Sequence, residues 1–455
     1  MTHLLWDSVS HVIETEVKRG LEDLLAAIRI PSVVAWGGEH LSVSAMFLAR
    51  LLEQDGWTAD RFVVGGNHVV FAEIGQSRAD DSAAMLLYAH HDVQPPEPLE
   101  AWATPPFEPA IRDGRIYARG SADDKGQFFC HIFAVRALQR LGGVPVRVKF
   151  FLDGEEEAGN PNLAATLEAL RPRMKAGFVY TVDGPVHPTG RPRVTFGFRG
   201  MLHMRLTVRT ASSSLHSGHW GNLAPDAALL LAQILAGLKN ADGRVTVPGF
   251  YDGVRPPTAK EREAIAAVPF DVDEVAAQIG ARALWGPSDV PPMERMMFLP
   301  TFTVTGLGSG YVGAGFQNSI PGEARAHIDV RYVPDQDPDQ IFAVLSEYLR
   351  VRAPEAQLTC LGTMPPSHTP MDTPAVRLVA EAIRRGFGVD PILLPRSGGS
   401  APDSLFTVGL GLPSLWAHLA NADARNHAPN ENMSLSHIRA GTLASAALIL
   451  NLADG

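Results

Sequence analysis

Residues 83–96 read AAMLLYAHHDVQPP, an apolar run that leads directly into His90, His91 and Asp92. A continuous apolar run of this length is typical of a strand buried on both faces of a sheet, and the prolines that follow cannot continue it. His90 and Asp92 are two residues apart, so both side chains point to one face if the strand continues through them. An imidazole beside a carboxylate suits a metal ligand or a general base with an orienting partner, although a surface cluster explains the same residues.

Similar apolar strands are predicted on both sides of this segment. Residues 68–74 (HVVFAEI), 146–153 (VRVKFFLD) and 177–183 (GFVYTVD) have the length and the β-branched or aromatic content of strands. Between two of them, residues 125–143 carry apolar side chains at helical spacing and end in two glycines. Strands that alternate with helices predict an α/β domain with a doubly wound, mainly parallel sheet.

Acidic residues follow several of these elements. Asp123 and Asp124 begin the predicted helix, three glutamates (155–157) come after the strand 146–153, and Asp183 ends the strand 177–183. Each has a structural explanation when taken alone, because carboxylates cap helices, line solvated loops and favour turns. Of the residues named so far, His90, Glu156, Glu157 and Asp183 all fall just past the carboxyl ends of predicted parallel strands, at the edge where such sheets bind their ligands. Oxygen and nitrogen ligands without thiolates favour Zn²⁺, with Mn²⁺ or Co²⁺ as alternatives.

The middle of the chain has a different pattern. Its strands alternate apolar and polar residues, as in a sheet with one solvated face. The order of predicted elements is β-α-β-β-α-β, which is the ferredoxin-like arrangement, and the Pro-rich stretch 240–300 is predicted to be an irregular insertion. We therefore expect a discontinuous catalytic domain (1–192 and 367–455) interrupted by a smaller α+β lid or dimerisation domain (193–366). The predicted elements of this smaller domain are 201–209, 224–238, 301–305, 324–333, 337–353 and 356–362.

The composition limits the classes of function. A formal net charge of −10 disfavours nucleic acid and anionic membranes as partners, since both require basic surfaces. No uncharged apolar run reaches the length of about 18 residues that a membrane helix needs. The only cysteines, Cys130 and Cys360, lie far apart, and residues 1–30 lack the pattern of a signal peptide. We therefore expect a reducing, cytoplasmic location.

Several motifs, in the same order along the chain, resemble those of the M20 metallopeptidases in their carnosinase-like dipeptidase branch. The first three are YAHHDVQPP (88–96), ARGSADDKGQ (118–127) and DGEEEAGNPNL (153–163). Two later segments, LHSGHWGN (215–222) and GGSAP (398–402), are also similar to the family's motifs. The resemblance covers nearly the whole chain, and the interrupted α/β architecture agrees with it.

The resemblance implies a dinuclear zinc centre. Asp123 bridges the two metals in this scheme, and in relatives it is joined to the next aspartate by a cis peptide. Asp92 orients one imidazole ligand. The last ligand should be a histidine near the carboxyl end, which the segment ARNHAPNEN (424–432) supplies as His427, a residue that would otherwise pass for an ordinary loop histidine. The implied metal ligands are His90, Asp123, Glu157, Asp183 and His427.

The resemblance also implies roles in catalysis. Glu156 corresponds to the family's general base, although the run of three glutamates leaves the register open. His216 corresponds to a histidine that stabilises the transition state in the partner subunit's site, so an active homodimer is expected. Arg331, with Gly399 and Ser400, is expected to hold the substrate's carboxylate, since a guanidinium suits that bidentate role. Without the resemblance, His216 and Arg331 would pass for ordinary loop and strand residues.

The function predicted from these residues is zinc-dependent hydrolysis of an amide bond. The expected substrates are dipeptides or similar short molecules with a free carboxylate. An N-acyl-amino-acid deacylase or deacetylase remains an alternative, because it would use the same metals. A catalytically silent metal-binding assembly protein is the alternative outside the enzymes.

Overall fold

The computed structural model describes residues 3–76 and 84–454; Ala83, in the first predicted strand, lies outside them. The chain forms two compact units, which we call unit 1 and unit 2. The segment Pro395–Ser404 packs with unit 2, although the sequence pattern assigns it to the second stretch of the catalytic domain. Unit 1 comprises Met1–Phe196, Thr369–Leu394 and Leu405–Gly455, and unit 2 comprises Gly197–His368 and Pro395–Ser404.

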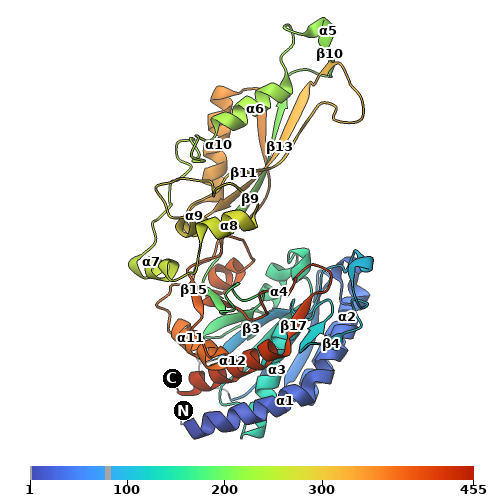
Figure 1. The fold of residues 1–455 in the computed structure, drawn as a ribbon, viewed down its shortest axis with the longest axis vertical. Coiled ribbons are helices and arrows are strands. Elements are labelled where there is room, and N and C mark those ends of the chain that lie inside the picture. The colour runs from blue at the N-terminus through green and yellow to red at the C-terminus, as the bar shows by residue number, and fades with distance from the viewer. Residues whose placement is uncertain (1–2, 77–83, 455) are drawn as a thin grey trace. The chain divides into compact units, whose positions relative to one another are not determined.

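Unit 1 is built on an eight-stranded sheet (Figure 1). Its strands are β1 (Thr58–Val64), β2 (Asn67–Ile74), β3 (Met85–His90), β6 (Val148–Asp153), β7 (Phe178–Val182), β8 (Arg193–Thr195), β15 (Ile392–Leu394) and β16 (Ser414–His418). Their order is β1-β2-β6-β3-β7-β16-β8-β15. The pairs β6–β3, β3–β7, β7–β16 and β8–β15 are parallel, and the other three are antiparallel. The predicted α/β fold with a mainly parallel sheet is confirmed.

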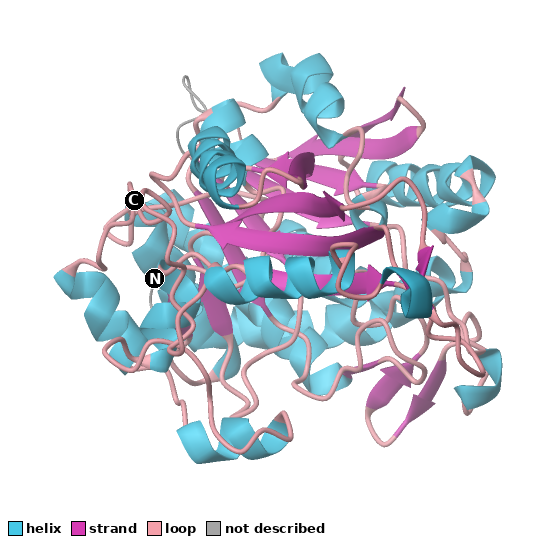
Figure 2. Ribbon diagram, turned by 90° about the horizontal axis from the view of Figure 1, so that it is seen from above, coloured by secondary structure: helices cyan, strands magenta, loops and turns pink. Residues whose placement is uncertain are grey.

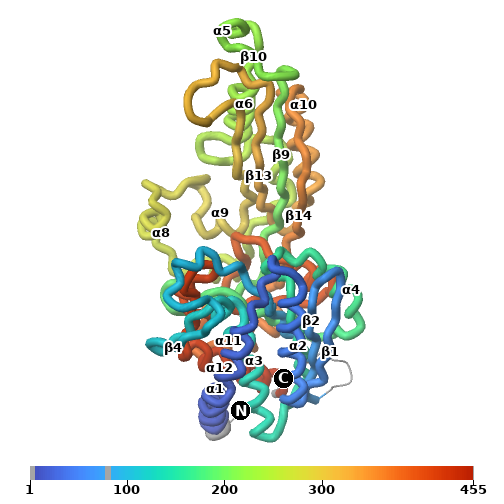
Figure 3. Tube along the Cα trace, turned by 90° about the vertical axis from the view of Figure 1, so that its right-hand side faces the viewer, coloured from blue at the N-terminus to red at the C-terminus, as the bar shows by residue number. Residues whose placement is uncertain are grey.

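Helices cover this sheet. They are α1 (His3–Arg29), α2 (Gly38–Gln54), α3 (Lys125–Arg140), α4 (Leu163–Leu170), α11 (Pro374–Phe387) and α12 (Leu435–Asp454). The central helix α3 is buried along most of its length and contacts both α1 and α12 (Figure 3). Helices α11 and α12 approach closely at Gly386, where a Cβ atom would lie 2.4 Å from the carbonyl oxygen of Ala440.

The ends of three central strands bring the acidic residues and His90 to one edge. Strands β3, β6 and β7 are parallel and buried throughout, which explains their uninterrupted apolar sequences. β3 ends at His90, whose register partner is Asp153 at the end of β6. Asp183 directly follows β7, and its N–H donates to the Ala417 carbonyl at 3.0 Å. The carboxyl ends of the three strands therefore share one edge of the sheet.

A small sheet in unit 1 joins distant parts of the chain. It consists of β4 (Ala110–Arg112), β5 (Arg115–Tyr117) and β17 (Asn432–Ser434), in the order β17-β5-β4. Beyond β5, the N–H of Ala118 donates to the carbonyl of Glu431 at 3.1 Å. This pairing places the segment before α3 beside the segment before α12.

Unit 2 has the predicted β-α-β-β-α-β order, and both units combine helices with strands (Figure 2). Its sheet, in the order β11-β13-β9-β14, is antiparallel. One face packs on α6 and α10 through a core that includes Leu206, Leu231 and Leu345. The elements are β9 (Gly200–Arg209), α6 (Ala227–Gly237), β11 (Thr303–Ser309), β13 (Glu323–Tyr332), α10 (Pro338–Arg352) and β14 (Ala356–Met364). A short β10 (Leu215–His216), paired with β12 (Ser319–Ile320), is followed by α5 (Ser217–Trp220).

The proline content of residues 240–300 predicts irregular chain, but the structure contains three short helices there. They are α7 (Ala259–Ala266), α8 (Val272–Gln278) and α9 (Pro292–Phe298). Thr258 and Glu261 form a capping box at α7, and Asp271 caps α8. The capping residues are visible in the sequence and predict helices here. The prediction of irregular chain gave more weight to the prolines than to these caps.

No helix within residues 3–76 and 84–454 is long and apolar enough to cross a membrane. The longest helix, α1, is amphipathic and packs against α3 and α12.

Candidate metal centre

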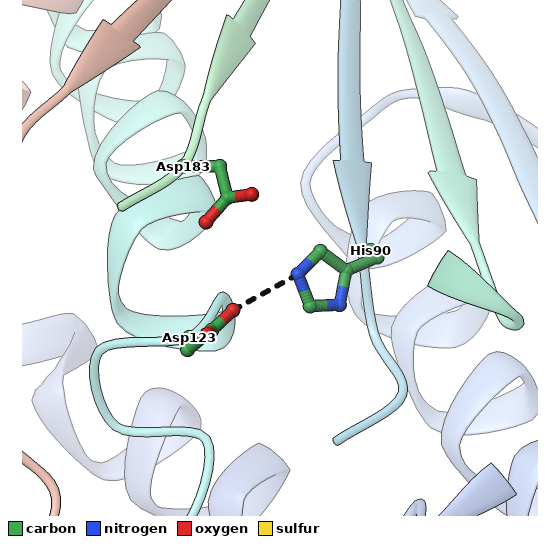
Figure 4. A group of neighbouring side chains, drawn as sticks. All are labelled: His90, Asp123 and Asp183. Carbon is green, nitrogen blue, oxygen red and sulfur yellow. Dashed lines mark hydrogen bonds and ion pairs between the residues drawn. The ribbon is translucent and has the colours of Figure 1, made fainter. Parts of the chain in front are cut away.

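The structure brings the predicted metal ligands of unit 1 together in two groups. His90, Asp123 and Asp183 form one group (Figure 4), and Asp123, Glu157 and His427 form the other. Within each group, one potential ligand atom from every residue lies within 4.8 Å of the others. Asp123 belongs to both groups, which is the arrangement expected of a bridging carboxylate.

His90 is oriented by carboxylates on both sides of its ring. Its Nε2 lies 3.1 Å from Asp123 Oδ1, and its Nδ1 lies 3.4 Å from Asp92 Oδ1. All three residues are almost fully buried. A carboxylate beside the second ring nitrogen is the usual arrangement for a histidine that binds metal.

Asp92 also holds the loop after β6. Its Oδ1 accepts from the N–H of Glu156 at 3.2 Å, and its Oδ2 accepts from the N–H of Glu157 at 3.0 Å. One buried carboxylate thus fixes the imidazole of His90 and the backbone of two glutamates. The predicted orienting role of Asp92 has a geometric basis in these contacts.

The three glutamates differ in their surroundings. Glu155 is buried and accepts from Asn162 Nδ2 at 2.9 Å. Glu157 Oε2 lies 3.3 Å from His427 Nε2 and accepts from Gln94 Nε2 at 2.9 Å. Among the described residues, none forms a hydrogen bond or an ion pair with the carboxylate of Glu156, which leaves this carboxylate available for chemistry. These contacts favour the register in which Glu157 is a ligand and Glu156 is the base.

His427 lies in the loop between β16 and β17. Its Nε2 is 3.0 Å from Asp123 Oδ2, which also accepts from Asn426 Nδ2 at 3.0 Å. The backbone of His427 has φ +60°, a left-handed conformation that is uncommon for residues other than glycine. Strained backbone conformations cluster at active sites and ligand-binding loops, which agrees with a functional role for His427.

A buried carboxylate that we did not predict, Glu431, holds the loop that carries Asp123. Its Oε1 accepts from the N–H groups of Ala122 at 2.8 Å and Asp123 at 3.0 Å. Its Oε2 accepts from the N–H of Gly120 at 3.1 Å and from Arg119 Nη1 at 2.6 Å. The loop leads to a cis peptide between Asp123 and Asp124, as the resemblance implies.

We expect Glu431→Gln to weaken metal binding by about 10- to 100-fold, the usual cost of removing a group that supports a metal ligand. An amide in place of the carboxylate would direct N–H groups at backbone donors and displace Asp123. Metal competition with a fluorescent chelator measures the affinity, and circular dichroism reports the fold. Glu53→Gln, on the exposed face of α2, is the control. Unchanged metal affinity in Glu431→Gln would contradict this role.

Lys125 is a second residue that we did not predict. It follows the two aspartates, is fully buried, and donates to the carbonyls of Ala27 and Ile30, both at 2.9 Å. These carbonyls lie at the end of α1, where carbonyl groups lack helical partners. Lys125 thus ties the start of α3 to the end of α1. The sequence gives little signal for either Lys125 or Glu431, because a charged residue in a loop or at the start of a helix is normally solvated.

The carboxylates of the centre repel one another. Burial and the nearby Asp123 raise the pKa of Asp183 to about 7. Burial likewise raises the pKa of Glu156 well above its ordinary value, with further repulsion from Asp183 and Glu157. Burial also opposes the charge on Asp123, but hydrogen bonds to His427 and His90 lower its pKa well below the usual range.

These features fit a pair of divalent cations. The donor atoms are imidazole nitrogens and carboxylate oxygens, which suit Zn²⁺, Mn²⁺ or Co²⁺. The acids are buried and close together, so positive charge between them would relieve their repulsion. The five residues that would hold the cations are His90, Asp123, Glu157, Asp183 and His427.

We expect metal binding to release about 2.5 protons at pH 7, because metal-bound histidines must be neutral and metal-bound carboxylates must be ionised. The pKa of Asp183 is about 7, so this ligand adds about half a proton to the two that the histidines release. Hydrogen bonds to Asp123 and Glu157 raise the pKa of His427 to about 10. Burial disfavours the charged form of His90, but hydrogen bonds to Asp123 and Asp92 outweigh it and raise its pKa well above 6.5. Both rings are therefore protonated at pH 7 without metal, and metal affinity should rise with pH.

Calorimetric titration of zinc in buffers of different ionisation enthalpy measures the proton release. His427→Gln should release about one proton fewer, since it removes one titrating ring. A binding enthalpy that is the same in every buffer would contradict the expected release.

The remaining predicted residues lie in unit 2. Arg331 Nη1 donates to Ser400 Oγ at 2.7 Å, and its Nε donates to Asp329 at 3.0 Å. Gly399 adjoins Ser400, so unit 2 brings the predicted carboxylate-binding residues together. His216 is exposed at the end of β10, where its ring stacks on His219 with centroids 4.3 Å apart.

The sequence of this chain is similar to those of known metallopeptidases. The family model described as Peptidase family M20/M25/M40 matches residues 86–451. A cysteinylglycine-S-conjugate dipeptidase of Corynebacterium striatum is 29% identical over 81% of this chain and 81% of its own length. The human Beta-Ala-His dipeptidase is 26% identical over 85% of this chain and 78% of its own.

Solved structures also resemble this chain. An M20 family metallo-carboxypeptidase from Sulfolobus solfataricus is 32% identical, with a TM-score of 0.83, over 95% of this chain and 99% of that one. Human carnosine dipeptidase 1 has the same fold, with a TM-score of 0.78 at 23% identity over 99% of both chains.

Proposed function

Because this chain belongs to peptidase family M20/M25/M40, we propose that it is a dinuclear zinc-dependent dipeptidase. Its substrates are dipeptides or similar short amides with a free C-terminal carboxylate. The observation that carries the proposal is the pair of ligand groups that share Asp123. The dipeptidase names of the curated relatives support the choice of substrate class.

The mechanism assigns a separate task to each group of residues. His90, Asp123, Glu157, Asp183 and His427 hold the cations, and Asp92 orients His90. Two divalent cations held there would polarise the substrate carbonyl and lower the pKa of water. Glu156 accepts a proton from the attacking water and returns it to the leaving amine. Burial strengthens Glu156 as a base, since it raises the pKa of this carboxyl.

Arg331, Ser400 and Gly399 bind the substrate's carboxylate in this proposal. The guanidinium of Arg331 is only partly neutralised by Asp329, and Ser400 holds it in place. A planar guanidinium can offer two parallel N–H donors to a carboxylate. In this proposal, the substrate must therefore have a free carboxyl terminus.

The direct test is hydrolysis of a dipeptide panel after chelation and metal add-back. The account predicts activity that chelation removes and that Zn²⁺, Mn²⁺ or Co²⁺ restores. A panel of N-acetyl amino acids is run beside it, because a deacylase would use the same metals. Faster hydrolysis of the N-acetyl compounds would identify a deacylase, and no hydrolysis of either panel would favour a silent metal-binding protein.

A carboxypeptidase is a second candidate, because the structurally similar Sulfolobus protein is a metallo-carboxypeptidase at 32% identity. It shares the need for a free carboxylate and differs in the length of the substrate. Comparing a dipeptide with the tripeptide and tetrapeptide that end in the same two residues separates the candidates. A dipeptidase loses kcat/KM as residues are added at the amino end, whereas a carboxypeptidase does not.

We also propose that the protein forms a homodimer through unit 2. Strand β11 is at the edge of its sheet, and no other strand in the described ranges 3–76 and 84–454 pairs with its outer side. Large apolar side chains on and after this strand are exposed, including Leu307 (63%), Val312 (94%) and Phe316 (102%). A second copy of the chain that packs on this surface would cover both the open edge and the apolar side chains.

We expect Leu307→Asp to raise the dimer Kd by about 30-fold or more, because it would bury a charge at the centre of this surface. Sedimentation equilibrium over a range of concentrations measures the Kd. Leu361→Asp is a matched control, since Leu361 is exposed on β14 at the opposite edge of the same sheet. Dissociation by the Leu361 change alone would place the interface elsewhere.

A further inference from the structure

Unit 2 contains a cavity of about 470 Å³ that has no part in the proposed metal chemistry. Its wall comes from the segment between α6 and β13, together with Arg199. Aromatic and aliphatic side chains such as Phe270, Leu284, Trp285 and Phe302 form most of the lining. Small-molecule sites have volumes of roughly 300–1,000 Å³ and apolar walls with a few polar groups, so both features fit a ligand site.

The charges of the lining are all of one sign. Three basic residues, Arg199, Lys239 and Arg295, line the cavity, and the described residues of its wall include no acidic side chain. This is unusual in a chain whose net charge is −10. Within the described part of the chain, none of the three forms an ion pair with a carboxylate.

The three cations donate to backbone carbonyls instead. Lys239 Nζ donates to Phe302 at 3.0 Å, Arg295 Nη1 donates to Pro287 at 3.2 Å, and Arg199 Nη1 donates to Leu299 at 3.1 Å. Neutral carbonyls only partly replace the hydration that these charges lose on burial. Burial accordingly lowers the pKa of Lys239, and burial with repulsion from Arg331 lowers the pKa of Arg199 to about 10.

Apolar surface accompanies these charges. Trp285 and Ile279 line the cavity, yet they are 68% and 64% exposed. The ring of Trp285 lies 4.5 Å from Lys239 Nζ, so an apolar surface and a cation adjoin one another. A ligand with an apolar body and an anionic end would cover the apolar surface of Trp285 and neutralise the charge of Lys239.

We propose that this cavity binds a small carboxylate with an apolar body and no cationic group. Its carboxylate would lie against Lys239 and the neighbouring guanidinium groups, and its body would pack on Trp285 and the aliphatic wall. Free amino acids are disfavoured, because their ammonium group would face three cations. Arylalkanoates and N-acylated amino acids satisfy both requirements.

Isothermal titration calorimetry of the full-length, metal-loaded protein with 4-phenylbutanoate tests the inference. The matched ligands are 4-phenylbutanamide, which lacks the charge, and L-phenylalanine, which adds an ammonium group. We expect 4-phenylbutanoate to bind at least about tenfold more tightly than either, the scale of one charge-assisted hydrogen bond. Equal affinity for acid and amide, or no binding of the acid, would overturn the proposal.

Variants locate the bound probe. Lys239→Met should weaken 4-phenylbutanoate by about tenfold or more, whereas Lys18→Met, on the exposed face of α1, should not. Ile279→Trp places a larger side chain in the cavity from an exposed position, and it should weaken the binding of 4-phenylbutanoate by a similar factor. This second variant keeps the test decisive if Lys239→Met fails to fold. Arg331→Ala should not weaken the affinity. Loss of binding in Arg331→Ala, with Lys239→Met and Ile279→Trp unaffected, would place the probe in the substrate's carboxylate site and overturn the inference.

Discussion

Glu156→Gln is expected to lower kcat by about 10²- to 10⁴-fold while the protein keeps both metal ions, because general base catalysis is worth this much. Glutamine preserves the size of the side chain and removes the group that accepts a proton from water. Its neighbours hold the loop in place, since the N–H groups of Glu156 and Glu157 both donate to Asp92. The loss should therefore appear in kcat and not in metal content.

The adjacent glutamates provide matched controls for the register. Glu157→Gln should weaken one metal, since Glu157 contacts His427 beside Asp123. Glu155→Gln should retain both metals and most activity, since Glu155 accepts from Asn162. Elemental analysis and steady-state kinetics on the three variants separate these outcomes. If Glu155→Gln abolishes turnover with metals bound and Glu156→Gln does not, the base is Glu155.

His216→Ala is expected to lower kcat by about 10²- to 10³-fold, the effect of removing one donor to the transition-state oxyanion. The same ring stacks on His219, which makes His219→Ala the natural control, with a much smaller expected effect. Sedimentation should show the same oligomeric state for both variants. Full activity in His216→Ala would remove this residue from the mechanism.

Mixing two inactive variants tests whether His216 acts in the partner's site. A heterodimer of Glu156→Gln and His216→Ala has one site with an intact base, served by the intact histidine of the other subunit. Random exchange makes half of the dimers mixed, each with one working site of two, so about a quarter of the wild-type activity should return. A mixture no more active than its separate components would show that His216 serves its own subunit or none.

Much of the metal centre could be predicted because local sequence determines it. The buried strands β3, β6 and β7 appear as apolar runs, and parallel packing brings their carboxyl ends to one edge. His90 and Asp183 follow from this argument alone. The order of elements in unit 2 was equally clear from alternation and helical spacing.

Other features depend on contacts between distant segments. His427 could be chosen only through the family resemblance, because nothing in its loop distinguishes it from a solvated histidine. Glu431 contacts residues about 300 positions earlier in the chain, so its support of the Asp123 loop is invisible in the sequence. Pro395–Ser404 packs with unit 2 for a similar reason, since Ser400 donates to the backbone of Arg199 at 2.6 Å.

The most direct test of the account is anomalous diffraction at the zinc edge from crystals grown with zinc. The account predicts two peaks that share Asp123, one within about 2.0–2.2 Å of His90 and Asp183, the other equally close to Glu157 and His427. The absence of a peak at these residues, or a single zinc bound elsewhere, would contradict it.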